Sequence, residues 1–206
     1  MSAIELSAEI LALLFFTGML AGMVDAIAGG GGLIALPALL ATGMPPTQAL
    51  ATNKLKGSFG TFSSSLYFIR NNLIRLSELK FMIACTFVGA AMGTLIVQRI
   101  STQFLASVIP LLLIAIALYF LLSPTISDEH RTPRASPLLF SLTIGFGVGF
   151  YDGFFGPGAG SFFAIGFVGL LGFGLTRATA PTKILNLTSN LASPSFFIIR
   201  GHVVWS

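Results

Sequence analysis

The feature that most constrains the fold is a series of apolar runs, several of them close to the length of a membrane span. The runs cover residues 10–24, 81–97, 104–122, 138–151 and 184–199. A helix needs about 20 apolar residues to cross a hydrocarbon core. Only 9% of the residues are charged, against about 25% in an ordinary soluble domain. The sequence therefore predicts an all-α, polytopic transmembrane helical bundle.

The basic residues lie mainly at the ends of the apolar runs. The formal net charge is +4, but no surface that interleaves aromatic and basic residues is visible, so we do not expect a nucleic-acid partner. We interpret the charge as a topology signal. Because basic loops favour the cytoplasm, we place Arg70, Arg75 and Lys80 inside, and Arg131 with Arg134 then also falls inside after two crossings.

The acidic N-terminus, the single cysteine and the two histidines argue against a signal peptide, a disulfide and a catalytic or metal site. Glu5 and Glu9 precede the first apolar run without any Lys or Arg, so the basic region of a signal peptide is missing and we expect this segment in the mature protein. The single Cys85 excludes an intramolecular disulfide and a Cys-based metal cluster. His130 and His202 are isolated from other ligand types, and no catalytic arrangement stands out. The sequence predicts no metal, no cofactor and no enzyme.

The chain also resembles itself. An offset of 127 positions relates Gly18, Gly22, Asp25, Gly29 and Gly31 to Gly145, Gly149, Asp152, Gly156 and Gly158. An offset of 129 positions then relates Gly43, Thr47, Ala49, Ala51, Lys54, Phe68 and Ile69 to Gly172, Thr176, Ala178, Ala180, Lys183, Phe197 and Ile198. Glycine matches arise by chance in a glycine-rich chain, but matched aspartates do not. We therefore interpret the chain as a duplication.

This repeat divides the chain into a first membrane unit at residues 1–122, a polar cytoplasmic linker at 123–135 and a second membrane unit at 136–206. Two apolar helices follow the matched segment in the first unit and have no counterpart in the second. The second unit thus looks as if it lacks its last two helices. We favour a fragment of a longer protein over a truncation in evolution.

The orientation of the N-terminus depends on residues 10–42. If this segment folds back at 25–32, each matched segment crosses once, the N-terminus lies outside and the two units are inverted repeats. If it crosses the membrane, the repeats are parallel. The lack of Lys and Arg before the first run favours inversion, although the sequence leaves both arrangements open.

Each unit contains a glycine run that cannot continue a stable helix, because each Gly costs roughly 1 kcal/mol relative to Ala. Irregular backbone at membrane depth is tolerated where it is buried in protein or lines a polar cavity, and broken helices mark the binding sites of many transporters. We expect a half-helix to begin after each break, near Leu33 and Ser161, with its unpaired N–H groups aimed at the break. Two re-entrant ends of this kind would form an anion site.

Glycines have other roles, which we weigh against this one. For Gly18-x-x-x-Gly22, Gly89-x-x-x-Gly93 and Gly145-x-x-x-Gly149 we expect close helix packing. Four consecutive glycines gain nothing in packing. Neither run is followed by the Gly-Lys-Ser or Gly-Lys-Thr of a phosphate-binding loop, so we do not expect nucleotide binding.

Charged residues accompany both breaks. Asp25 and Asp152 either couple transport to protons or cations, or cap the breaks by accepting hydrogen bonds from freed N–H groups. Lys54 and Lys183 are expected to begin the following helices, where each could meet an anion or an aspartate, or simply extend to the interface. The candidate substrate-binding residues are Gly29, Gly30, Gly31, Gly32, Asn53, Lys54, Gly156, Gly158, Gly160, Thr182 and Lys183, with Thr52 and Asn186 as weaker candidates.

Two stretches carry a family resemblance. Residues 22–37 (GMVDAIAGGGGLIALP) and 49–54 (ALATNK) resemble the sulfite exporter TauE/SafE family, and the second copy and the ending at 200–205 (RGHVVW) resemble its later motifs. The resemblance implies a multi-pass permease of the bacterial inner membrane for sulfite, sulfonates or related sulfur-containing anions. Family members are typically longer, so the chain departs from the family by lacking the last pair of segments.

We therefore predict a transporter of a small, sulfur-containing anion such as sulfite or an organosulfonate, with proton coupling as one option. Its expected partners are the anion, the lipid bilayer and, at most, a second copy in a homodimer. An anion channel of the same architecture and a non-transporting membrane scaffold are the alternatives.

Overall fold

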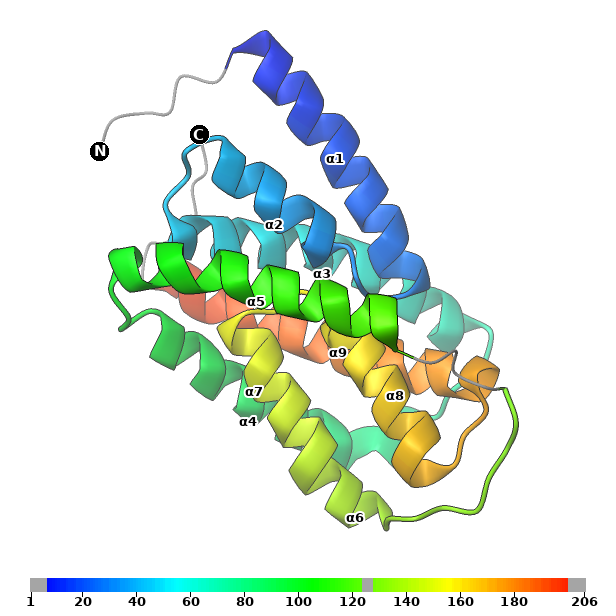
Figure 1. Cartoon of the computed structure of the whole chain (residues 1–206). Coiled ribbons are helices and arrows are strands. Elements are labelled where there is room, and N and C mark those ends of the chain that lie inside the picture. Colours follow the sequence, from blue (N-terminus) through cyan, green and yellow to red (C-terminus); the bar gives the residue numbers. More distant parts are fainter. Residues whose placement is uncertain (1–6, 124–127, 200–206) are drawn as a thin grey trace.

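In the computed structural model the described residues are 7–123 and 128–199, and every regular element in these ranges is helical (Figure 1). Glu5, His202 and the motif at 200–205 lie outside the described residues. The elements are α1 (Ala8–Ile27), α2 (Gly32–Ala41), α3 (Pro46–Arg70), α4 (Leu76–Val97), α5 (Thr102–Leu122), α6 (Pro137–Phe140), the π-helical η1 (Ser141–Gly145), α7 (Phe146–Phe154), α8 (Ala159–Leu171) and α9 (Leu175–Ile199). The all-α prediction is confirmed.

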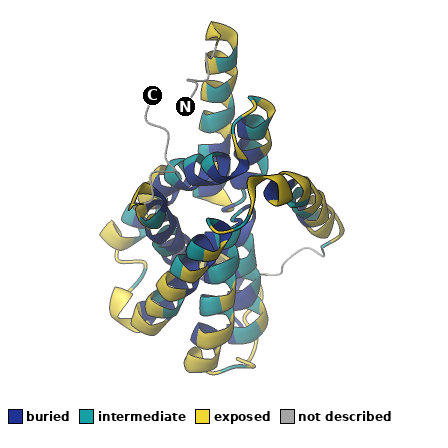
Figure 2. Cartoon of the chain, turned by 90° about the vertical axis from the view of Figure 1, so that its left-hand side faces the viewer, coloured by how far each residue is buried: buried dark blue, intermediate teal, exposed yellow. Residues whose placement is uncertain are grey.

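Four of the described helices are long and apolar enough to cross a membrane: α1, α4, α5 and the continuous helix Pro137–Phe154 that α6, η1 and α7 form together. The outer helices are largely exposed (Figure 2), and their exposed side chains include large apolar ones such as Phe15 on α1 and Leu121 on α5. Such surfaces are stable only when lipid or protein covers them, because contact with water is unfavourable for apolar groups. The chain is thus a multi-pass membrane protein.

The chain folds back at each glycine break (Figure 1). α1 ends at Ile27 and α2 returns from Gly32; α7 ends at Phe154 and α8 returns from Ala159. A new half-helix therefore begins after each break, within two residues of the expected positions, Leu33 and Ser161. The ends of α1 and α7 keep the offset of 127, and α3 and α9, each with 25 residues, keep the offset of 129. The duplication as such stays a prediction from the sequence.

α3 and α9 pack against each other in opposite directions. The Ser58 hydroxyl donates to the carbonyl of Asn190, and the Ser65 hydroxyl donates to the carbonyl of Lys183 at 3.0 Å. Rising residue numbers on α3 thus meet falling numbers on α9. Of the two topologies left open by the sequence, this antiparallel contact is the one expected of inverted repeats.

Glycines bring α4 and α7 into backbone contact. A Cβ built on Gly89 would lie 2.3 Å from the carbonyl oxygen of Phe146, and one on Gly153 would lie 2.0 Å from that of Ala90. This confirms the packing role expected of Gly89, Gly93, Gly145 and Gly149. On α1 the outcome is mixed: a Cβ on Gly60 of α3 would lie 3.1 Å from the carbonyl oxygen of Gly22, so α3 packs closely there, whereas a Cβ on Gly18 meets nothing within 4 Å.

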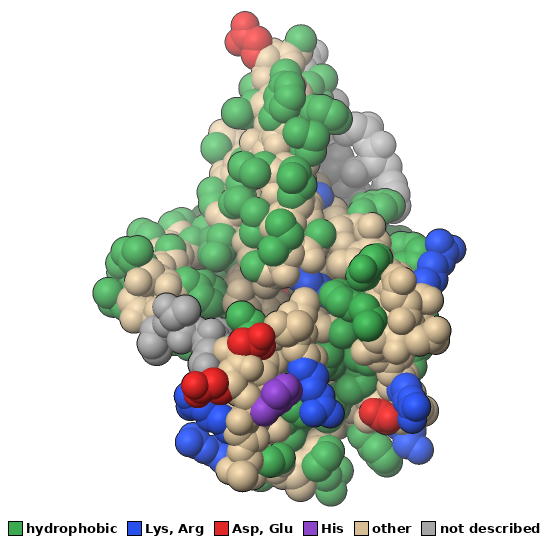
Figure 3. Space-filling model, turned by 90° about the vertical axis from the view of Figure 1, so that its right-hand side faces the viewer, with side chains coloured by type: hydrophobic (Ala, Val, Ile, Leu, Met, Phe, Trp, Pro, Cys, Tyr) green, Lys and Arg blue, Asp and Glu red, His purple; other side chains and the backbone are tan. Residues whose placement is uncertain are grey.

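The described part of the linker is docked on the turn between α8 and α9. The backbone N–H of Arg131 donates to the carbonyl of Gly172 at 2.9 Å, and the Asp128 carboxylate accepts from the backbone N–H and the hydroxyl of Thr176. The hydrogen bond from the Thr176 backbone, followed by that from its hydroxyl, lowers the pKa of Asp128. The loops after α3, α5 and α8 lie at one end of the bundle (Figure 1), and most charged side chains visible in Figure 3 gather there.

The contact between α4 and α7 makes a testable prediction about stability. We expect Gly153→Leu to lower the free energy of unfolding by about 1–3 kcal/mol or more, because the new side chain overlaps the backbone of α4. Gly147→Leu is the matched control, since a Cβ at this position on the same helix meets nothing within 4 Å. Thermal melting of the purified protein in detergent measures both variants; equal melting temperatures would contradict the contact.

Candidate functional site between the two helix breaks

The two lysines of the candidate site lie inside their helices. We expected Lys54 and Lys183 to begin helices, but α3 begins at Pro46 and α9 at Leu175, so this expectation was wrong. Proline suits the first turn of a helix, where its missing N–H needs no partner, and it starts α3 before the polar residues that we took as a boundary. Lys54 is 2% exposed and Lys183 is 1% exposed, so neither extends to the interface.

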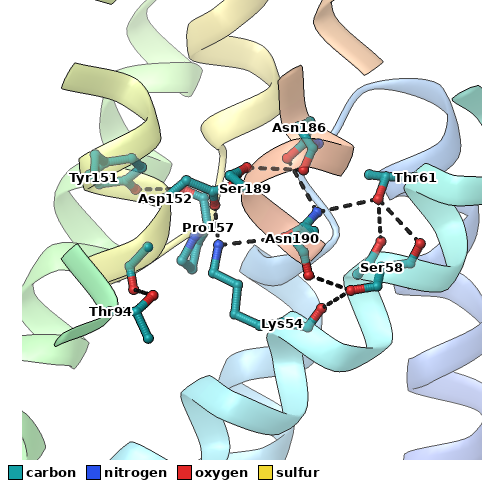
Figure 4. A network of polar contacts seen from close by, with 12 residues as sticks. Lys54, Ser58, Thr61, Thr94, Tyr151, Asp152, Pro157, Asn186, Ser189 and Asn190 are labelled. Atoms are coloured by element: carbon teal, nitrogen blue, oxygen red, sulfur yellow. Dashed lines mark hydrogen bonds and ion pairs between the residues drawn. The ribbon is translucent and has the colours of Figure 1, made fainter. Parts of the chain in front are cut away.

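Lys54 is bound to an aspartate of the other break (Figure 4). Its ammonium group donates to one carboxylate oxygen of Asp152, and the Ser189 hydroxyl donates to the other oxygen. The amide oxygen of Asn190 lies 3.5 Å from the same ammonium nitrogen. Charges buried this deeply are costly unless they are paired and their remaining polar groups are hydrogen-bonded. The ion pair therefore links α3 to α7, and the hydrogen bond from Ser189 links the same carboxylate to α9.

Asp25 is held differently from Asp152. One carboxylate oxygen accepts a hydrogen bond from the backbone N–H of Gly31 at 2.7 Å, which is the contact expected of a residue that caps the break. The other oxygen pairs with the ammonium group of Lys56 at 2.7 Å. The carboxylate of Asp152 accepts instead from two side chains, those of Lys54 and Ser189. The coupling role of either aspartate stays a prediction.

Lys183 has a neutral partner instead of a carboxylate. Its ammonium group donates to the backbone carbonyl of Asp25 at 2.7 Å. Across residues 7–123 and 128–199, no carboxylate oxygen lies within the 4.0 Å of an ion pair with it. The network thus combines three lysines, Lys54, the part-buried Lys56 and Lys183, with two aspartates, and its formal charge is +1.

The two breaks touch through their glycines. A Cβ on Gly29 would lie 2.6 Å from the Cα of Gly160, and a Cβ on Gly156 would lie 2.6 Å from the ammonium nitrogen of Lys54. Gly29 and Gly156 also have φ values of 78° and 103°, which L side chains rarely adopt. Both positions therefore require glycine for the backbone conformation; at Gly29 the backbone of Gly160 also leaves no space for a side chain, and at Gly156 a side chain would displace the ammonium group of Lys54.

The other predicted glycines lie around this contact. Gly31 supplies the N–H for Asp25, Gly32 lies against Asn53 and Pro157, and Gly158 lies against the ring of Phe120. Gly30 lies near Val24 and has open space on its other sides. The structure thus brings Gly29, Gly31, Gly32, Gly156 and Gly160 to the ion-pair network and leaves Gly30 and Gly158 at its edge.

Two cavities adjoin the network. The small cavity, of about 20 Å³, is lined by both aspartates, Asn53, Lys54 and Asn186, among others, and has room for about one water molecule. The large cavity, of about 550 Å³, lies within the range of small-ligand sites. Lys183 and Thr182 line the large cavity together with Ser161 of α8 and apolar residues of α1, α5 and α8.

One residue that lines each cavity has a buried polar atom without a hydrogen-bond partner among the described residues. These atoms are Oδ1 of Asn53, a residue of the small cavity, and Oγ1 of Thr182, a residue of the large cavity. The two residues occupy matched positions of the repeat, each directly before its lysine. Because buried polar atoms are nearly always satisfied, such a pair points to a polar ligand or ordered water at each position. The role of Asn53 and Thr182 in substrate binding stays a prediction.

Sequence reasoning missed three residues of the network: Lys56, Ser189 and Asn190. A helical pattern of polar residues was present in the sequence, with Asn186 and Asn190 one turn apart on the same face. Because polar residues on one face of an apolar helix indicate a polar site, this pattern predicts Asn190 and its neighbour Ser189 as site residues. The pattern does not predict that Lys56 pairs with Asp25.

Comparisons with known proteins agree on one family. The family model described as "Sulfite exporter TauE/SafE" matches residues 14–206. The chain is 51% identical over 205 residues to the "Probable membrane transporter protein YfcA" of Escherichia coli K12, covering 100% of this chain and 76% of that protein. It is 48% identical to a "Probable membrane transporter protein" of Haemophilus influenzae, in an alignment that covers 98% of this chain and 79% of that protein. It is 46% identical to the "Probable membrane transporter protein ORF9" of a Sinorhizobium species, in an alignment that covers 98% of this chain and 77% of that protein. No solved structure matches.

The Lys54–Asp152 pair predicts a pattern of stabilities. We expect Lys54→Met and Asp152→Leu each to cost about 3–5 kcal/mol, because each leaves one buried charge without its partner. The double variant should cost clearly less than the sum, since no unpaired charge remains. Melting temperatures in detergent of the four proteins in this cycle give the comparison. Additive losses would show that the two side chains do not stabilise each other.

Proposed function

The chain belongs to the sulfite exporter TauE/SafE family and is a membrane transporter, and from that premise we propose that it carries a small, sulfur-containing anion such as sulfite or an organosulfonate through the site between the two breaks. The observation that supports an anion is the uncompensated charge of Lys183. A buried ammonium group without a counter-charge is costly, and an anion beside it offsets that cost.

The surroundings of Lys183 suit an oxyanion. Thr182 lines the same cavity, and its hydroxyl, which has no hydrogen-bond partner among the described residues, is a potential donor to an oxyanion. Ser161, in the first turn of α8, lines the cavity as well, and the free N–H groups of a helix start favour negative charge. Apolar residues such as Ile27 and Ile165 form the rest of the wall, which leaves space for a short organic group on a sulfonate.

The cavities also support a direction of access. The large cavity reaches Ser123, at the end of α5, and Leu175, at the start of α9, both at the end of the bundle that carries the basic loops. Basic loops favour the cytoplasm, so we propose that the large cavity opens to the cytoplasm of a bacterium from within its inner membrane. An anion would then enter from inside and bind first at Lys183.

A carrier fits this arrangement better than a channel. A channel of the same architecture needs a continuous path, whereas the network adjoins a small cavity with room for about one water molecule. Passage of an oxyanion then requires the Lys54–Asp152 pair to open. We propose that this opening is the transport step, and that the aspartates take up a proton or cation during it.

Flux measurements with one lysine removed test the proposal. In proteoliposomes we expect saturable flux of radiolabelled sulfite or a sulfonate, sensitive to a pH gradient, and a loss of at least tenfold in Lys183→Gln, because the uncompensated positive charge is gone. Lys80→Gln, an exposed lysine on α4, is the control and should keep the flux.

Three outcomes would contradict the proposal. Unsaturable flux that ignores the pH gradient would indicate a channel. Equal flux in Lys183→Gln and the parent protein, with both folded, would remove Lys183 from the site. Absence of flux for every anion tested would indicate a scaffold.

A further inference from the structure

Lys56 breaks the symmetry of the site. It lies on α3, two residues after Lys54, and its ammonium group pairs with the Asp25 carboxylate at 2.7 Å. The matched position of the second unit, at the offset of 129, is Leu185. The second break therefore has no equivalent lysine, and Lys56 lines neither the small nor the large cavity.

The two matched lysine–aspartate pairs differ as a result. Lys54 binds the carboxylate of Asp152, whereas its counterpart Lys183 binds only the backbone carbonyl of the matched aspartate, Asp25. Lys183 thus already lies against Asp25. The carboxylate of that residue is engaged elsewhere, with one oxygen on the Gly31 N–H and the other on Lys56.

We propose that Lys56 is a positioning residue for anion binding: it neutralises Asp25 and thereby keeps the positive charge of Lys183 available to the anion. Without Lys56, the Asp25 carboxylate has one oxygen free and turns to Lys183, as Asp152 does to Lys54. The carboxylate then competes with the anion for the same ammonium group. This inference rests on the proposed function, because it assumes that Lys183 receives the anion.

Transport kinetics in proteoliposomes, with radiolabelled sulfite as the probe, test this role. Lys56→Leu installs the residue of the second unit and should raise the KM at least tenfold with a smaller change in kcat, because affinity is lost before transport. Lys56→Arg keeps the charge beside Asp25 and should keep the KM within about threefold. Lys80→Leu removes a remote exposed lysine and serves as the control.

A second substitution separates this role from a merely structural one. Asp25→Asn in the Lys56→Leu background should return the KM towards that of the parent protein, because a neutral amide does not neutralise Lys183. An unchanged KM in Lys56→Leu would overturn the inference. So would a raised KM that Asp25→Asn fails to lower while the double variant elutes and melts as a folded protein.

A measurement without flux keeps the inference testable on its own. In the Lys56→Leu background, Asp25→Asn and Lys183→Gln should change the melting temperature in a non-additive way, because the two side chains now form a pair. In the parent background the same two substitutions should be closer to additive. Equal coupling in both backgrounds would overturn the role of Lys56, whereas an absence of flux in the parent protein would count against the proposed function alone.

Discussion

A lysine buried at membrane depth is costly without a counter-charge, and the arrangement of the two breaks depends on how that need is met. Lys54 meets it with Asp152, which lies 98 positions further along the chain on another helix. The pair forms only if α3 and α7 approach at the level of the breaks. Glycine makes that approach possible, since side chains at Gly156 and Gly160 would occupy the space of the lysine and of the opposite backbone. The electrostatic requirement and the glycine content are thus parts of one arrangement.

The charges around the two breaks are unequal, although the elements that carry them correspond. The first break holds a capped aspartate with its own lysine, and the second holds an aspartate that draws its lysine from the first unit. A symmetric network would pair every charge and leave nothing for a ligand. The extra lysine on one side leaves a single positive charge at the larger cavity, and this inequality gives the site its affinity for anions in our proposal.

The sequence predicted what depends on local chemistry. The apolar runs and the glycine breaks follow from backbone and solvation costs that act on a few neighbouring residues. Both breaks and four of the five runs are found where expected, whereas the run 184–199 lies in α9, which is not among the candidate membrane spans. Contacts between distant residues were harder to predict: the aspartate that meets Lys54 could not be chosen from spacing. Lys56 was missed because it departs from the repeat that guided the search. The start of α3 was predicted too late, at Lys54, because the polar residues before this lysine were taken as a loop, whereas the helix begins at Pro46 and includes them. The pair Gly18 and Gly22 has the spacing of a packing motif, but spacing did not show that Gly22 has a close neighbour, Gly60 of α3, and Gly18 has none within 4 Å of its Cβ position.

The direct contact between Gly29 and Gly160 has a mechanical consequence. Two backbones meet there with no side chain between them, so there is no rotamer that can change to absorb a shift. A displacement of one half-helix would therefore be passed directly to the other, and the two breaks are expected to behave as one rigid unit.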